Sequence, residues 1–170
     1  MIDIQYFSDQ LKSNAKSITN LVDGLSNEQT RWRPAKDKWS ILEVVNHLYE
    51  EEQKDFPLRL KYMLYNPEKT WPSINPVAWV IENNYNDRNI NESMKKILDE
   101  RDKSVEWLHE IKNPNWENEY EASWGKIKAG DMFAVWVTHD LLHIRQIINL
   151  KRLFYQNQFE NYTPDYAGKW

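Results

Sequence analysis

Apolar residues recur at intervals of three and four in four long stretches of the chain. This spacing is typical of an amphipathic helix with one buried face. The helices it predicts span residues 3–23, 41 to about 60, 91 to about 112, and 131 to about 154. Apolar residues cover much of the circumference of the last, which indicates a central helix. Four long helices without convincing strands predict an all-α four-helix bundle.

Local signals define the ends of the second predicted helix. Ser40, followed by Glu43, forms a capping box, so this helix is expected to begin near Ile41. Pro57 lies within the periodic run and is expected to kink or divide the helix. Residues 66–76 contain three prolines. They predict a long loop after the second helix that crosses the bundle instead of turning back directly.

Shorter segments give weaker patterns. A short helix is expected over residues 77–83 and a short extended piece over 119–123, followed by a polar turn between Gly125 and Gly130. The irregular tail, 157–170, has too few periodic apolar residues for another helix. Its aromatic residues are expected to pack on the bundle: Tyr162, Tyr166 and Trp170. No repeat or domain boundary is evident, so a single domain over 1–170 is predicted.

Composition limits the classes of function. The chain has no cysteine, which excludes disulfides and thiolate metal sites. Its 22 basic and 26 acidic residues are interspersed, without the basic stripe expected of a nucleic-acid-binding protein. The first residues lack the pattern of a signal peptide, and no apolar run reaches the length of a membrane span. These features predict a cytoplasmic protein that contacts neither nucleic acid nor membrane.

Two histidines in the last predicted helix are candidates for metal binding. His139 and His143 are four residues apart and therefore share a helix face, where two imidazoles can converge on one cation. The pair also fits two histidines packed in a core or lying on a wetted edge. It is not a zincin motif, because Asp140 stands where that motif has glutamate.

The other two histidines have ordinary interpretations when taken alone. His47 lies at the edge of the apolar face of the second helix, where a boundary residue with one polar partner is expected. His109 lies near a helix C-terminus and is best explained as a surface cation interacting with the helix dipole. Residues 50–52 are three glutamates and predict a solvated face, although Glu50 and Glu51 can reach a ligand near His47.

Two motifs resemble signatures of the DinB/YfiT-like superfamily. The first runs from Arg33-Pro34 through Lys38-Trp39-Ser40 to Asn46-His47-Leu48, and the second is the run 139–147, which begins His-Asp-Leu-Leu-His. The ending, 166–170, is also similar to that of many members. The resemblance covers nearly the whole chain. It implies a four-helix bundle in which one histidine of the second helix joins the His-x-x-x-His pair of the last.

The resemblance implies that His47, His139 and His143 bind a divalent metal, with zinc or nickel expected. Three imidazoles leave a coordination position open for water or substrate, as in catalytic sites. Known activities in the superfamily imply a metal-dependent hydrolase, or a transferase using a low-molecular-weight thiol such as bacillithiol. Residues that could support such chemistry are Glu50, Glu51, Asp140 and Gln146. An ion pair between helices is the alternative role for Asp140.

A second class of function stays open at this stage. The bundle can instead be a non-catalytic protein that holds a metal or small ligand, or that forms a dimer. Dimers are common in the superfamily, so a homodimer is an expectation of the resemblance alone. A third possibility, action on damaged DNA, conflicts with the acidic charge balance of the chain.

Overall fold

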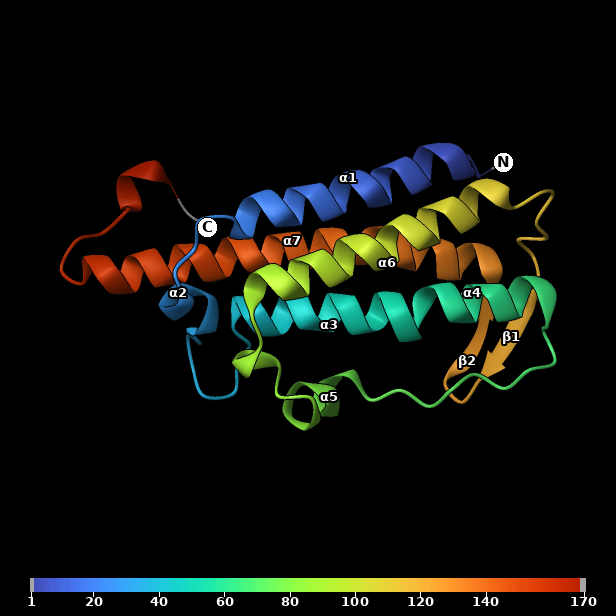
Figure 1. The fold of residues 1–170 in the computed structure, drawn as a ribbon, viewed down its shortest axis with the longest axis horizontal. Helices are drawn as coiled ribbons and strands as arrows, with labels where there is room; N and C mark the ends of the chain where they lie inside the picture. The colour runs from blue at the N-terminus through green and yellow to red at the C-terminus, as the bar shows by residue number, and fades with distance from the viewer. Residues whose placement is uncertain (1, 169–170) are drawn as a thin grey trace.

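The computed structural model describes residues 2–168 and is dominated by helices (Figure 1). The helices are α1 (Ile4–Val22), α2 (Asn27–Arg31), α3 (Ile41–Lys54), α4 (Phe56–Tyr65), α5 (Pro76–Glu82), α6 (Ile90–Glu110) and α7 (Ala129–Phe159). Two 3₁₀ turns, η1 (Tyr85–Asp87) and η2 (Asp165–Ala167), and two strands, β1 (Glu119–Ala122) and β2 (Gly125–Lys128), complete the described elements.

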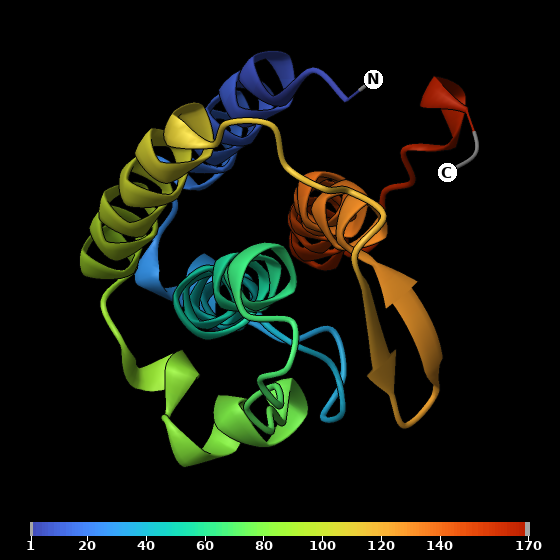
Figure 2. The same ribbon diagram turned by 90° about the vertical axis from the view of Figure 1, so that its right-hand side faces the viewer.

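Four helical rods form the bundle: α1, the continuous pair α3–α4, α6 and α7. Around the bundle, α1 packs against α6 and α7, and the α3–α4 rod packs against the same two helices. Figure 2 shows this arrangement end-on, with α3–α4 diagonal to α1. The segment between α4 and α6 returns along the length of the bundle and carries α5, so α6 runs parallel to α3–α4 (Figure 1). The predicted four-helix bundle and its crossing loop are confirmed.

The second rod is divided, as Pro57 predicts. Helix α3 ends at Lys54 and α4 begins at Phe56, with Asp55 between them at φ −119° and ψ −90°. Pro57 occupies the first turn of α4, where its missing N–H leaves no helical hydrogen bond unmade. The capping box at the start of α3 is also present: Ser40 Oγ accepts from Glu43 N–H, and the Glu43 carboxylate accepts from Ser40 N–H.

Buried side chains from all four rods form the core. Large members are Trp136, Phe133, Leu60, Ile97 and Ile147, each at most 1% exposed. Burying such a side chain stabilises the fold by about 1.5–3 kcal/mol. None of the helices within residues 2–168 has both the length and the apolar character needed to cross a membrane.

A β-hairpin precedes α7: the extended piece predicted over 119–123 is present as β1, whereas the polar turn predicted between Gly125 and Gly130 is wrong. Strands β1 and β2 pair antiparallel, and Gly125 opens β2 with a φ of +135°, a conformation that favours glycine. Gly130 lies inside the first turn of α7. Tyr120 of β1 stacks on Trp71 at 3.9 Å between ring centroids and accepts a hydrogen bond from its backbone N–H. The hairpin therefore holds the crossing loop in place.

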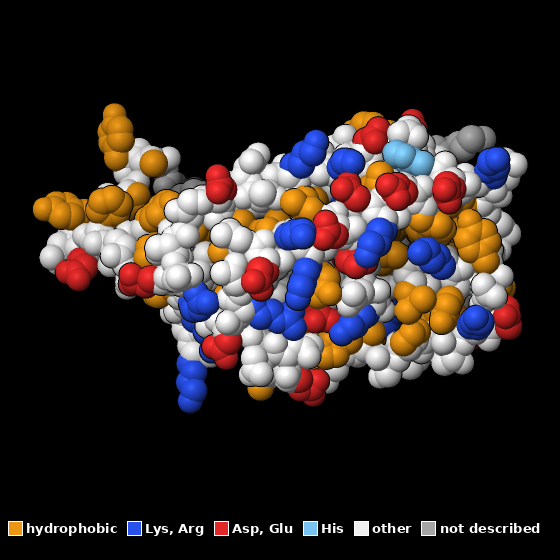
Figure 3. Space-filling view, viewed as in Figure 1, with side chains coloured by type: hydrophobic (Ala, Val, Ile, Leu, Met, Phe, Trp, Pro, Cys, Tyr) orange, Lys and Arg blue, Asp and Glu red, His pale blue; other side chains and the backbone are white. Residues whose placement is uncertain are grey.

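The C-terminal part of the chain also departs from prediction. Helix α7 continues to Phe159, so it projects past the ends of its neighbours (Figure 1). Tyr162 is 79% exposed and Tyr166 is fully exposed, so their expected packing on the bundle is wrong. Trp170 lies outside the described residues. Figure 3 shows hydrophobic side chains on the projecting end, whereas the rest of that face mixes both signs of charge.

Candidate metal centre

Three of the four histidines converge between two rods of the bundle. His47 comes from α3, and His139 and His143 come from consecutive turns of α7. Within residues 2–168 they form a potential metal-binding group whose ligand atoms lie within 4.8 Å of one another. The fourth, His109, lies at the end of α6 with its Nε2 3.7 Å from an Asp9 oxygen. The structure thus brings together the three histidines named by the resemblance and leaves His109 apart.

The geometry of the histidine pair on α7 fits a cation. Their Nε2 atoms lie 3.1 Å apart, close to the roughly 3.3 Å that separates two imidazole nitrogens on a tetrahedral zinc ion. Two lone pairs repel at this distance unless a proton or a cation lies between them. His143 Nδ1 lies 2.8 Å from Gln146 Oε1, which can only accept, so this nitrogen carries the hydrogen. The lone pair of His143 is therefore on Nε2, facing His139.

The protein environment keeps these histidines neutral. Burial, with the neighbouring histidines, lowers the pKa of His47 to about 3, and burial chiefly lowers that of His139 to about 4. Burial also lowers the pKa of His143. Metals bind the neutral imidazole, so at neutral pH no proton must be removed before a cation binds. Imidazole ligands suit zinc, nickel, copper and iron.

These low pKa values predict acid sensitivity of the metal-free protein. An unfolded histidine gains a proton near pH 6.5, whereas folded His47 stays neutral to about pH 3, so stability falls as the pH falls below 6.5. Between pH 6.5 and 4.5 this contribution is about 2–3 kcal/mol. Urea unfolding at several pH values is expected to give a shallower pH dependence for His47→Gln than for the unsubstituted protein.

The pH dependence of the unsubstituted protein alone would not isolate the contribution of His47, because the carboxyl group of Glu51 has the opposite effect on stability as the pH falls. Burial raises the pKa of Glu51 to about 8, which favours the folded state as the pH falls from 8 towards 4.5. Both proteins contain Glu51, so its contribution largely cancels in the difference. Equal pH dependence in the two proteins would show that His47 is not buried in its neutral form.

Aromatic side chains flank the histidines. The Trp39 ring lies 5.0 Å from the His47 ring, and the Phe56 ring lies 4.9 Å from that of His139, measured between centroids. Trp39 precedes the capping box of α3, and Phe56 opens α4, so both positions follow from the helix boundaries described above. These rings lower the local polarity, which strengthens electrostatic interactions with a bound cation.

The three consecutive glutamates of α3 are buried, so the expected solvated face is wrong. Their exposed fractions are 3–4%. Glu50 pairs with Lys54 and lies 3.4 Å from an Arg88 nitrogen. Glu51 faces His47, with 3.9 Å between Oε1 and Nδ1. Charged groups enter a core only with partners, and the sequence could not show that these partners come from α6, α7 and the crossing loop.

Asp140 is held by an arginine of another helix. It is 1% exposed, and its carboxylate accepts hydrogen bonds of 2.7 and 3.1 Å from Arg101 of α6. Arg101 also lies 2.9 Å from Glu52, which in turn accepts a hydrogen bond from Trp136 Nε1. The ion pair between helices, which was the alternative role expected for Asp140, is therefore present, but its partner Arg101 and the link to Glu52 were not predicted. The sequence signal of this network is Arg101 itself, which occurs four residues after Ile97 and four before Val105, where the buried stripe needs a core residue.

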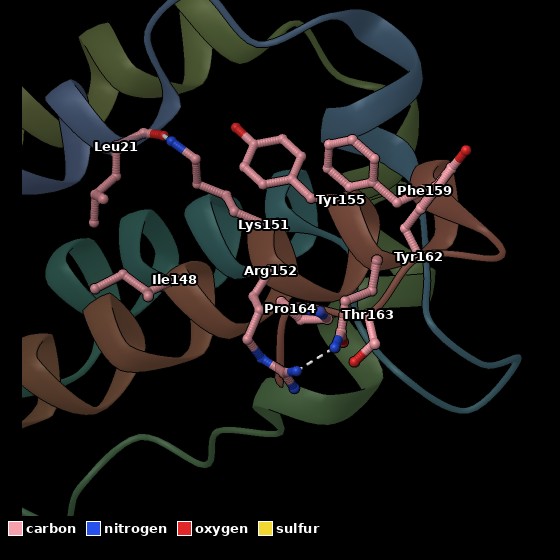
Figure 4. Close-up of a pocket in the computed structure, with 10 residues that line it drawn as sticks. Leu21, Ile148, Lys151, Arg152, Tyr155, Phe159, Tyr162, Thr163 and Pro164 are labelled. Carbon is pink, nitrogen blue, oxygen red and sulfur yellow. Dashed lines mark hydrogen bonds between the residues drawn. The ribbon is translucent and has the colours of Figure 1, made fainter. Parts of the chain in front are cut away.

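A groove between the C-terminal part of α7 and the tail is separate from the histidines. It has a volume of about 590 Å³ and lies between the C-terminal half of α7, the end of α1 and the tail. Figure 4 shows Leu21 and Ile148 at one end and Tyr155 and Phe159 at the other. None of the described residues that line it belongs to the histidine cluster. The groove therefore has no direct part in metal binding.

Comparison with known proteins supports the fold and identifies a family. A sequence model described as the DinB superfamily matches residues 10–147. Among solved structures, YfiT from Bacillus subtilis matches with a TM-score of 0.79 and 15% sequence identity, over 89% of each chain. It is described as a probable metal-dependent hydrolase with an unusual four-helix bundle topology. A search of curated proteins gave no match.

Proposed function

Because the chain belongs to the DinB superfamily, we propose that it is a divalent-metal-dependent enzyme that acts on a small molecule. The ligands in this proposal are His47, His139 and His143. The observation that carries it is the convergence of three neutral imidazoles from two rods of the bundle. Zinc and nickel are the cations we propose, since both bind imidazole well.

Hydrolysis and thiol S-transfer are the two reactions that this centre suits. When bound, a divalent cation lowers the pKa of water or of a thiol at the position left open by three ligands. Hydrolysis is supported by the likeness to YfiT, itself described as a probable metal-dependent hydrolase. Transfer requires a low-molecular-weight thiol, for which bacillithiol is the expectation from the superfamily.

The protein's own residues orient the ligands and exclude water. Gln146 fixes the ring of His143 through the Nδ1 contact, and Trp39 and Phe56 flank the other two histidines. Glu50 and Asp140 are engaged by basic side chains, so we assign them structural roles and no proton transfer.

Metal analysis combined with turnover assays tests the proposal. We expect tag-free protein to contain close to one equivalent of zinc, nickel or a similar metal by ICP-MS. Conjugation of a thiol to monochlorobimane and hydrolysis of a chromogenic ester would be measured on the same sample, before and after chelation. Activity that is lost on chelation and restored by metal supports the enzyme. Protein that stays empty after divalent metals are added would rule out the metalloenzyme.

A non-catalytic, dimerising bundle is the second candidate function. Its support is a set of exposed apolar side chains on α7: Leu141, Leu142, Tyr155 and Phe159, which are 46–64% exposed. Light scattering on the sample used for metal analysis distinguishes a single chain of 20.6 kDa from a dimer. A dimer that holds metal but turns over neither substrate would favour this candidate over the enzyme.

A further inference from the structure

We propose that Glu51 is the positioning residue of His47. In this assignment the Glu51 carboxyl oxygen Oε1 accepts a hydrogen bond from His47 Nδ1–H, which directs the Nε2 lone pair towards His139 and His143. The assignment rests on the proposed metal centre and adds to it a residue that does not itself bind the cation. It explains how a ligand from α3 is oriented towards two ligands that α7 holds on its own.

The first argument is a pair of buried polar atoms that face each other without partners. His47 and Glu51 are 6% and 4% exposed. His47 Nδ1 and Glu51 Oε1 are both fully buried and make no hydrogen bond to the described residues. They lie 3.9 Å apart, one helical turn from each other. Burial of an unpaired polar group is unfavourable, so a small rotation that closes this gap stabilises the folded state.

The second argument is the contrast between His47 and His143. The Nδ1 of His143 already has an acceptor, Gln146 Oε1, at 2.8 Å. A metal-binding histidine almost always donates its other ring nitrogen to such an acceptor, which fixes the tautomer and increases the basicity of the ligand. Glu51 Oε1 is the oxygen placed to do this for His47. Without it, the imidazole from α3 has no group that selects Nε2 as its ligand atom.

The third argument is that Glu51 is itself held by a row of side chains. Residues 47, 51, 55 and 59 follow at intervals of four, and this row continues through the break between α3 and α4. The Glu51 and Asp55 carboxyl groups share a hydrogen bond. Asp55 Oδ1 lies 2.6 Å from Arg59 Nε, and the Arg59 guanidinium lies over the Trp71 ring. The row leaves Glu51 little freedom to turn away from His47.

Cobalt binding to matched variants tests the assignment. Co²⁺ is the probe, because its visible d–d bands report the ligand set while a titration reports the affinity. We expect Glu51→Leu, which removes the acceptor, to weaken Co²⁺ binding by about 10- to 100-fold, the usual effect of losing such a partner. The band positions are expected to stay unchanged, since the three nitrogen ligands remain. Glu51→Gln, whose Oε1 can accept as Gln146 Oε1 does from His143, is expected to retain most of the affinity.

Glu50→Leu is the matched control. Glu50 is equally buried on the neighbouring position of α3, but its ion pairs within residues 2–168 are with Lys54 and Arg88. We expect this variant to bind Co²⁺ as the unsubstituted protein does. Equal affinity of Glu51→Leu and the unsubstituted protein would overturn the assignment. Altered d–d bands in Glu51→Leu would also overturn it, because Glu51 would then be a ligand.

Long-range ¹H–¹⁵N NMR of the zinc-loaded, unsubstituted protein gives a test that does not depend on a variant folding. A protonated, hydrogen-bonded Nδ1 of His47 is expected, and an Nδ1 without a proton would contradict the assignment. The possible outcomes distinguish a failure of the proposed metal centre from a failure of the role assigned to Glu51. Failure of the unsubstituted protein to bind any metal refutes the metal centre, whereas normal binding without an effect of Glu51→Leu refutes only the role of Glu51.

Discussion

Replacing Arg101 with methionine is expected to destabilise the protein by about 3–5 kcal/mol, the usual cost of removing one partner from a buried ion pair. Arg101 is 3% exposed and lies between two carboxylates, with Glu52 at 2.9 Å and Asp140 at 2.7 Å. It also donates a hydrogen bond to the backbone carbonyl of Leu11. Chemical unfolding, followed by circular dichroism, measures the change in the free energy of unfolding.

The large effect follows from what the substitution leaves behind. Without the guanidinium, two buried carboxylates face each other with no positive charge between them, and at least one must take up a proton. Helices α1, α3, α6 and α7 all contribute to this network, so its loss weakens contacts among all four rods.

Two further variants test whether the loss of stability in Arg101→Met comes from the unpaired buried carboxylates. Lys103→Met on the same helix breaks an exposed ion pair with Glu100, and it is expected to leave the free energy of unfolding almost unchanged. Replacing Arg101, Glu52 and Asp140 together with apolar residues removes every charge and is expected to recover much of the stability. A cost for Arg101→Met that is no larger than that for Lys103→Met would contradict a buried, charged network.

His143→Ala is expected to abolish stoichiometric metal binding. The substitution removes one of three ligands and leaves the His139 Nε2 without the nitrogen that lies 3.1 Å away. Loss of a ligand should exceed the loss of about 100-fold seen when only a ligand's supporting partner is removed. ICP-MS after dialysis measures the metal content, and a thermal melt of the metal-free protein reports whether the fold is retained.

His109→Ala is the appropriate control, because it removes a histidine that lies outside the cluster. We expect it to retain the metal content of the unsubstituted protein. The metal-free fold of His143→Ala should be stable, since a half-buried side chain with one hydrogen bond to Gln146 contributes only about 1 kcal/mol. Normal metal content in a folded His143→Ala protein would exclude His143 as a ligand.

Periodicity predicted the bundle because each rod buries a continuous apolar stripe. The signals for the second rod were local, and the structure contains both the capping box at Ser40 and the division near Pro57. The extended piece predicted over 119–123 corresponds to β1, but β2 and the pairing were missed because each strand has four residues, of which only Tyr120 and Ile127 are large apolar residues facing each other. Such short strands give almost no alternation to detect.

The three histidines were identified from the sequence through the resemblance, since spacing alone connects only the pair on α7. The surroundings of the site were less predictable. Glu51 and Glu52 were expected on a solvated surface but are 3–4% exposed, and Glu52 pairs with Arg101 of α6. A glutamate in a sequence gives no sign of whether an arginine from a distant helix will reach it. Long-range pairing of charges is therefore the part of the site that required the structure.

The separation of the ligands along the chain bears on when a metal can be acquired. His139 and His143 are one turn apart, but His47 precedes them by about 90 residues, so joining it to them closes a long loop at a considerable entropic cost. In zinc fingers, ligands close in sequence allow the cation to drive folding. In the proposed metal centre the packing of α3 against α7 must bring the three histidines together, so we expect a newly synthesised chain to fold before it captures metal.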